Sequence, residues 1–119
     1  MNKKDEKSVK KLIEYCDMMM ETVEYFGNDE DIFKSNIFYQ NASSFIIMQI
    51  GDYVNRLSDE FLDAHPEIPW SEIMCMRIIH AHHYESVIDE IAWETIQNDI
   101  PYFENILKSY FNFYNLSKN

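Results

Sequence analysis

The segment from residue 77 to residue 84 holds the side chains of this chain that are best suited to chemistry. It carries Arg77, then His82 five positions on, and then Tyr84. Arginine is a permanently charged, forked ligand for phosphate, and histidine gives and takes protons near neutral pH. These residue types suit cleavage of a phosphodiester without a metal ion.

Two further histidines, His80 and His83, raise the alternative of a metal site. Imidazole is a common zinc or nickel ligand, and these two residues lie one turn apart on a helix. No cysteine or carboxylate is placed in the sequence to complete a tetrahedral set with them. We therefore expect no metal and no cofactor, and expect His80 and His83 to be partly exposed polar residues beside the site.

The charge of the chain limits how it could bind a polyanion. Its 10 basic and 21 acidic residues give a net charge of −11, which repels nucleic acid over the surface as a whole. A phosphate site must therefore be local. Five lysines crowd the first eleven positions, and we interpret them as the solvated start of a helix rather than as an RNA-binding arm.

Length and composition predict one all-α domain over residues 1–119. Two glycines and three prolines leave little room for turns, while seven methionines and 46% hydrophobic residues favour long helices. No apolar run approaches the roughly 18 residues of a membrane span, and the two cysteines, Cys16 and Cys75, have no metal spacing. We expect a soluble cytoplasmic protein with reduced thiols and no membrane partner.

Apolar periodicity predicts the elements that position the site. One helix is expected over about residues 5–26, ending at Gly27, and a longer one over about 36–64, closed by His65 and Pro66. The apolar positions of these two helices are Val9, Leu12, Ile13, Cys16, Met19, Met20, Val23, Phe38, Ala42, Phe45, Ile46, Ile50, Tyr53, Val54, Leu57 and Phe61.

The second half of the chain predicts shorter elements. Residues 66–70 form a stiff connector with Ile68 and Trp70 as packing anchors, followed by a helix over about 71–83. Another helix begins near residue 86, and the last begins at Asp99, which we interpret as its N-cap. The expected architecture is a four-to-five-helix bundle, with Trp93 as a further packing anchor.

Several landmarks together resemble a known family. They are the runs 49–52, 57–61, 65–73 and 93–101, together with Met76-Arg77 and His82-His83-Tyr84. In this order and without a large gap, they resemble the HepT-like branch of the HEPN ribonuclease toxins over about residues 36–107. The resemblance implies an all-helical HEPN bundle that is usually a two-fold dimer. It also implies a partner, a minimal nucleotidyltransferase of the MntA kind that acts as antitoxin.

The family pattern Arg-x4-His-x-Tyr implies specific roles for three residues. Arg77 and His82 take the catalytic positions of a metal-independent RNA endonuclease, and Tyr84 takes the position that the partner adenylylates to silence the toxin. The implied system is a type VII-like toxin–antitoxin pair that acts on RNA, with no DNA partner. The chain departs from the family at Ile78, where members commonly have a polar residue, and this departure predicts weak catalysis.

The spacing of the catalytic pair makes a simple helix insufficient. Five residues at 3.6 per turn place Arg77 and His82 about 140° apart on an ideal helix. Either the helix bends or ends before His82, or the working pair is assembled across a two-fold dimer. We prefer a dimeric cleft together with a helix end, because Ser86 offers a cap for a new helix.

Asp52 and the overall function keep alternatives open. Asp52 lies among apolar residues after Gly51, where it could orient an active-site Arg or His or could be a solvated helix position. The alternatives to a nuclease toxin are a catalytically weak or inactive binding subunit of a nucleotidyltransferase complex, and a structural helical dimer without chemistry.

Overall fold

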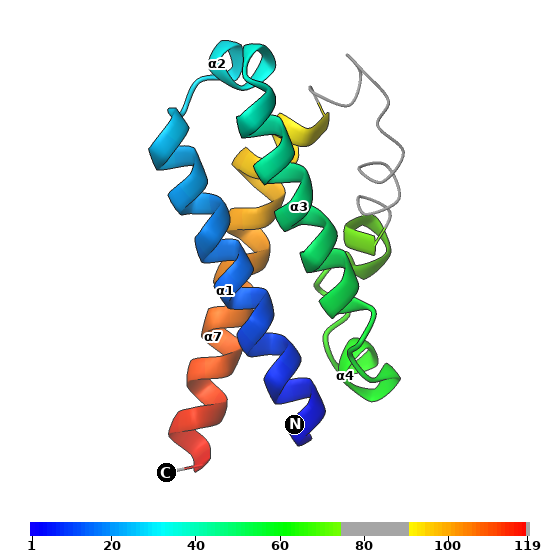
Figure 1. Ribbon diagram of the computed structural model, residues 1–119. Coiled ribbons are helices and arrows are strands. Elements are labelled where there is room, and N and C mark those ends of the chain that lie inside the picture. The colour runs from blue at the N-terminus through cyan, green and yellow to red at the C-terminus, as the bar shows by residue number, and fades with distance from the viewer. Residues whose placement is uncertain (75–90, 119) are drawn as a thin grey trace.

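The computed structural model describes residues 1–74 and 91–118, and within these ranges every regular element is helical. Two long helices, α1 and α3, lie side by side, and α7 packs against α1, crossing behind it in the view of Figure 1. The elements are α1 (Lys3–Phe26), α2 (Glu30–Ser35), α3 (Ile37–Val54), α4 (Asp59–Ala64), the π-helical turn η1 (Thr95–Asp99) and α7 (Ile100–Lys118), with further helical residues at 70–74 and 91–94. The predicted all-α bundle is confirmed.

Helix α1 begins and ends where local chemistry dictates. The Asn2 side chain accepts a hydrogen bond from the Asp5 N–H (2.7 Å), which caps the first turn. At the other end Gly27 adopts φ +119°, a conformation that L side chains rarely take, and its N–H donates to the Val23 carbonyl. The predicted span of 5–26 is thus confirmed to within two residues. Met20, predicted to be buried, is 42% exposed.

A short helix that sequence analysis did not predict fills the corner between α1 and α3. Helix α2 is capped by Asp29, whose carboxylate accepts from the N–H groups of Asp31 and Ile32. The corner is fixed by the buried Tyr39 of α3, whose hydroxyl donates to the Gly27 carbonyl at 3.1 Å. The hydroxyl of the buried Tyr39 thus has its hydrogen-bond partner in the turn that its ring covers.

The predicted single helix over residues 36–64 is wrong, because α3 ends at Val54 and α4 begins at Asp59. Ser58 caps α4 through its hydroxyl, which accepts from the Phe61 N–H. The Asp5 carboxylate of α1 in turn accepts from the Ser58 N–H (2.9 Å) and hydroxyl (2.6 Å). A buried charge from a distant helix thus fixes this break, which periodicity alone cannot show.

The connector after α4 has the predicted anchors. Helix α4 ends before His65, as the Pro66 that follows requires. Ile68 is buried, and the Trp70 indole N–H donates to the carbonyls of Leu62 and His65. The connector is therefore held against α4 by both packing and hydrogen bonds.

The last helix does not start at an N-cap as predicted. Asp99 belongs to the π-helical turn η1, and the Ile100 N–H donates to the Thr95 carbonyl, one residue further back than in an α-helix. The reason lies in Pro101, which has no N–H and whose ring clashes with the carbonyl four residues earlier. A widened turn accommodates the proline, so the helix continues from residue 91 into α7 instead of restarting.

Most of the apolar positions predicted for the helix after residue 36 are buried or partly buried, and Phe38 and Phe45 are the exceptions. Phe38 and Phe45 of α3 were expected in the core, but they are 73% and 53% exposed. The buried positions of α3 are Tyr39, Ser43, Ile46, Ile47, Ile50, Gly51 and Val54. Trp93 packs against Phe33 (ring centroids 5.5 Å apart), which confirms it as a packing residue.

The early lysines form an exposed face of α1, as expected. Lys10 pairs with Glu6 (3.6 Å) and Lys11 with Glu14 (3.2 Å), both on the surface. Across the described parts of the chain, no helix has the length and apolar character needed to cross a lipid bilayer.

Candidate functional site

Most of the predicted site residues lie outside the described residues. These are Arg77, His80, His82, His83 and Tyr84, and Ile78 lies there too. Asp52 is the predicted site residue that the structure places. What the structure adds is therefore the surroundings of the segment: the elements that lead into it and out of it, and their charges.

The two ends of the segment meet at one cavity of about 130 Å³. Ile73 lines it from the helical residues 70–74, and Ile91 lines it from the helical residues 91–94. Ile73 itself is buried in the core, and so is Ala92, the residue after Ile91. The described residues that precede and follow residues 75–90 thus come together at one cavity.

This cavity is acidic. The charged side chains among the described residues that line it are Glu72 and Asp99. The pKa of Asp99 is raised by partial burial and then by the nearby charges of Glu94 and Glu72, while a hydrogen bond with Thr95 opposes the rise. Carboxylates in this arrangement repel phosphate and favour a cationic neighbour, so the phosphate of a substrate would have to be held by other residues.

The π-helical turn shapes one wall of the same cavity. Thr95 and Asp99, its first and last residues, both line it. π-Helical turns are rare and occur often at functional sites, because they redirect side chains on an otherwise regular helix. Sequence analysis missed this turn, although Pro101 was a signal for it.

Asp52 lies in the last turns of α3 and is partly exposed. It shares the outward face of that helix with Phe38 and Phe45, which lie fourteen and seven residues before it. Its position does not separate the two predicted roles, orientation of a catalytic group and solvated helix position.

Several of the described cations contact partners near them. Arg56 stacks on the Tyr53 ring at 4.5 Å, Lys34 lies 3.7 Å from Glu30, and Lys108 bridges two carboxylates. Within the described ranges, no group of three or more His, Cys, Asp or Glu side chains could hold a metal ion.

A buried carboxyl between α1 and α7 is a feature that sequence analysis missed. Glu104 is 7% exposed. Its pKa is raised to about 7, chiefly by burial and then by its hydrogen bond with Asp17. Lys108 donates to Asp17 at 3.0 Å and lies 3.3 Å from Glu104. The buried Cys16 thiol lies near the same cluster, and its pKa is also raised by burial. The four-residue spacing of Glu104 and Lys108 is visible in the sequence, but no sequence signal shows that Asp17 of α1 contacts this pair.

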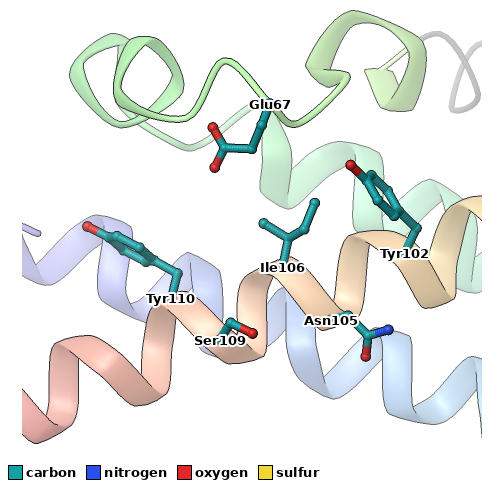
Figure 2. A pocket seen from close by; sticks show the side chains of 6 residues that line it. All are labelled: Glu67, Tyr102, Asn105, Ile106, Ser109 and Tyr110. Atoms are coloured by element: carbon teal, nitrogen blue, oxygen red, sulfur yellow. The ribbon is translucent and has the colours of Figure 1, made fainter.

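A larger and shallower groove of about 660 Å³ runs along α7. Figure 2 shows Glu67 of the connector and Ile106 of α7 pointing toward one another, with Tyr102 and Tyr110 on either side of Ile106. Its charged lining residue, among those described, is a carboxylate. The groove could accommodate apolar or aromatic groups, and its described lining contains no cationic side chain that could bind phosphate.

Comparison with known proteins identifies the family. Residues 9–110 match the family described as Ribonuclease HepT-like, which is most of the chain. The chain belongs to the ribonuclease HepT-like family. The bundle described above is accordingly an all-α fold of the HEPN type, and the resemblance found in the sequence is confirmed.

Individual relatives of this HepT-like chain match over shorter stretches. A protein of Caldanaerobacter subterraneus subsp. tengcongensis, provisionally named an RNase, is 42% identical over 59 residues, which are 50% of this chain and 53% of the relative. The "Probable ribonuclease HepT" of Thermococcus cleftensis is 38% identical over 52 residues, 44% of this chain and 47% of the relative. The chain thus spans about half the length of the curated relatives it matches. No solved structure matches it.

Proposed function

We propose that the chain is a metal-independent RNA endonuclease and the toxin of a type VII-like toxin–antitoxin pair. The observation that carries the proposal is the family match over residues 9–110, which spans the Arg77, His82 and Tyr84 pattern. Arg77 and His82 are the proposed catalytic residues, and Tyr84 is the proposed regulatory residue.

The proposed chemistry is transfer of an RNA phosphate to its own ribose. The 2′-oxygen attacks the adjacent phosphorus while the bond from phosphorus to the 5′-oxygen breaks, which leaves a cyclic phosphate and a 5′-hydroxyl end. His82 takes the proton of the 2′-hydroxyl or gives one to the 5′-oxygen, a role typically worth about 10²–10⁴-fold in rate. Arg77 binds the non-bridging oxygens, where negative charge grows in the transition state.

The proposed regulator is a minimal nucleotidyltransferase that adenylylates Tyr84. The phenol stands two residues after His82 in the sequence. AMP on Tyr84 would add bulk and negative charge beside the position that an RNA phosphate must reach, and would block it by both effects.

A two-fold dimer is part of the proposal because of the charges of the chain. The charged residues among the described lining of the cavity at Ile73 and Ile91 are acidic, and no described lysine or arginine lines it. One Arg77 in a chain of net charge −11 makes a weak phosphate site. Two copies of Arg77 and His82 at one cleft would double the local positive charge. Arg77 of one copy could then act with His82 of the other, although the two residues point about 140° apart on one ideal helix.

The test of catalysis is expression of Arg77→Ala and His82→Ala variants in the host cell with a parallel RNA cleavage assay on purified protein. We expect each variant to lose toxicity and cleavage while keeping the helical circular dichroism of the unmodified chain. His80→Ala serves as the matched control, with a milder effect because it lies outside the pattern. Cleavage that persists in both catalytic variants would rule the mechanism out.

The test of regulation is co-expression with the cognate nucleotidyltransferase, followed by intact mass measurement. The chain with its natural Tyr84 should gain mass in units of AMP, and the Tyr84→Phe variant should not. Equal modification of Tyr84→Phe would mean that another residue is the acceptor.

One observation favours a second function, a binding subunit that cleaves RNA poorly or not at all. Ile78 replaces the polar residue that commonly follows the arginine in the family. Purified protein that associates with the nucleotidyltransferase and leaves RNA intact would favour this second function.

A further inference from the structure

A cavity of about 290 Å³ lies where the start of α1, helix α4 and helix α7 meet. Asp5 lines it from α1, Glu60 and Phe61 line it from α4, and His65 and Tyr110 complete its wall. None of these residues lines the cavity at the ends of the predicted catalytic segment. Small-molecule sites usually measure about 300–1,000 Å³, so this cavity suits one small chemical group.

His65 is the residue of this cavity with an unsatisfied polar atom. It is 9% exposed, and its ring centroid lies 4.6 Å from that of Phe61 and 4.2 Å from that of Tyr110. Its Nδ1 lies 3.4 Å from the Glu67 carboxylate, while its buried Nε2 has no hydrogen-bond partner among the described residues. A buried polar atom without a partner is rare in native structures, so this nitrogen calls for an explanation.

The contact with Glu67 determines what Nε2 can do and where it points. A carboxylate only accepts hydrogen bonds, so it favours the proton on Nδ1 and leaves Nε2 of the neutral ring as an acceptor. The two nitrogens point toward opposite sides of an imidazole ring, so Nε2 points away from Glu67. In the described linings, Glu67 belongs to the α7 groove and His65 to this cavity. Nε2 is thus an acceptor on the cavity side of the ring.

The charges around the cavity favour a cationic ligand. Its charged side chains among the described residues are the carboxylates of Asp5 and Glu60, and no described lysine or arginine lines it. Asp5 is 2% exposed, and the donors that it accepts from, the N–H and hydroxyl of Ser58, are neutral. The aromatic rings of Phe61 and Tyr110 add faces that attract cations.

A metal ion fits the cavity less well than an organic cation. Imidazole and carboxylates can bind metals, but within the described ranges no three such side chains are placed to hold one ion. An ammonium or guanidinium group requires an acceptor, a carboxylate and an aromatic wall, and His65, Glu60 and Tyr110 supply these.

From these features we infer that the cavity binds the ammonium or guanidinium group of a ligand, with His65 Nε2 as its acceptor and Asp5 and Glu60 as its counter-charges. Such a site is independent of the proposed nuclease chemistry. Because Nε2 is buried, we expect a ligand to shift the partly exposed Tyr110 ring, which borders both the cavity and the α7 groove. The cationic group could belong to a free polyamine or to a side chain of a partner protein.

The first experiment titrates the chain with agmatine, which carries both cationic groups, by calorimetry. Salt at about 0.15 M screens the loose attraction of cations to a chain of charge −11. We expect saturable binding at one site, and no binding of the neutral butane-1,4-diol. No saturable binding of agmatine overturns the inference.

The matching variant is His65→Phe, which keeps an aromatic ring between Phe61 and Tyr110 and removes the acceptor. Its affinity for agmatine should fall about tenfold or more, while its circular dichroism stays that of the parent chain. Its Tm should be equal or higher, because a buried unsatisfied nitrogen is lost. An equal affinity in His65→Phe overturns the inference.

A second pair of variants leaves the core untouched. Glu60 and Glu24 are both exposed, but Glu60 lines the cavity and Glu24 does not. We expect Glu60→Gln to weaken agmatine binding by about two- to fivefold and Glu24→Gln to leave it unchanged. Equal effects of the two variants, including none, would mean that agmatine does not contact Glu60, and would contradict the inference.

Nuclear magnetic resonance of the histidine ring nitrogens reports the contact directly. The signals of His65 are those missing from His65→Phe, and in the free chain they should show a proton on Nδ1 and none on Nε2. Agmatine should shift the Nε2 signal more than the Nδ1 signal. An Nε2 signal that stays unchanged at saturating agmatine places the ligand elsewhere.

Two further probes define the class of ligand. Nα-acetyl-arginine amide stands for a side chain of a partner protein, so His65-dependent binding as tight as that of agmatine supports a protein source, and weaker binding supports a free polyamine. Zinc is the competing cation. His65-dependent binding of zinc without binding of agmatine would assign a metal site and overturn the inference.

Discussion

Replacement of Glu104 by glutamine tests the buried contact between α1 and α7. The protonated carboxyl of Glu104 shares a hydrogen bond with Asp17, and Lys108 lies 3.0 Å from Asp17 and 3.3 Å from Glu104. The amide of glutamine can donate to Asp17 as the protonated carboxyl does, and it never becomes charged. Glu104→Gln therefore keeps the geometry and removes the titration.

The magnitude follows from the pKa of Glu104, which rises from 4.5 to about 7 on folding, chiefly because burial penalises the charged form. A carboxyl whose pKa is higher in the folded state stabilises the fold fully below pH 4.5 and loses that contribution as pH rises through 7. At about 1.4 kcal/mol per pKa unit, the full loss approaches roughly 3 kcal/mol. Asp17, whose pKa is lowered by its hydrogen bond with Glu104, titrates together with it, so we expect about 2 kcal/mol to be observed.

Thermal and urea unfolding at pH 5 and pH 8 measures this difference. We expect Glu104→Gln and the unmodified chain to be nearly equal at pH 5, and the variant to be more stable at pH 8 by about 2 kcal/mol, or roughly 5–10 °C in Tm. Comparison of the two proteins cancels the titration of the groups that do not interact with Glu104. Glu14→Gln is the control, because Glu14 is exposed in its pair with Lys11. If the two stability curves run parallel between pH 5 and pH 8, Glu104 is not buried in its neutral form.

Two further changes probe the break between α3 and α4 and the departure from the family pattern. Asp5→Ala should lower the free energy of unfolding by about 2–4 kcal/mol in urea, because it removes the buried carboxylate that accepts from the partly buried Ser58 N–H and hydroxyl. Lys4→Ala on the exposed face should have little effect. Ile78→Asn should raise RNA cleavage and lower Tm. A polar residue after Arg77 can hold phosphate or a catalytic side chain, and such a contact is worth about 2–4 kcal/mol in the transition state. If the parent chain is already active and Ile78→Asn leaves cleavage unchanged, a polar residue at this position is dispensable.

Periodicity predicted the helices well where one face of a helix is buried and one is not. Helix α1 is the clearest case, since Val9, Leu12, Cys16 and Met19 are fully buried at the predicted steps of three and four. Sequence analysis failed where a contact from far along the chain decides the local structure. The Asp5 carboxylate at Ser58 divides the predicted 36–64 helix, and no local signal near Ser58 identifies that partner.

The two phenylalanines of α3 show a different limit. Phe38 and Phe45 follow the same spacing as core residues, so hydrophobicity alone assigned them to the core of their own chain. A hydrophobic stripe, however, reports only that a surface avoids water, and it does not say whether the same chain or another covers it. A helix with apolar residues on two opposite faces, as in α3, is the pattern expected when both occur.

The acidic surroundings of the predicted site connect the charge of the chain to its proposed regulation. Glu72 and Asp99 line the cavity that Ile73 and Ile91 also line, and these two residues precede and follow residues 75–90 in the sequence. In the proposed function, a phosphate that binds Arg77 must overcome the repulsion of a chain with a net charge of −11. Binding of RNA at such a site would depend on a small surplus of attraction from Arg77 and a second copy of it. In the proposed regulation, AMP on Tyr84 adds one more negative charge that opposes the binding of an RNA phosphate.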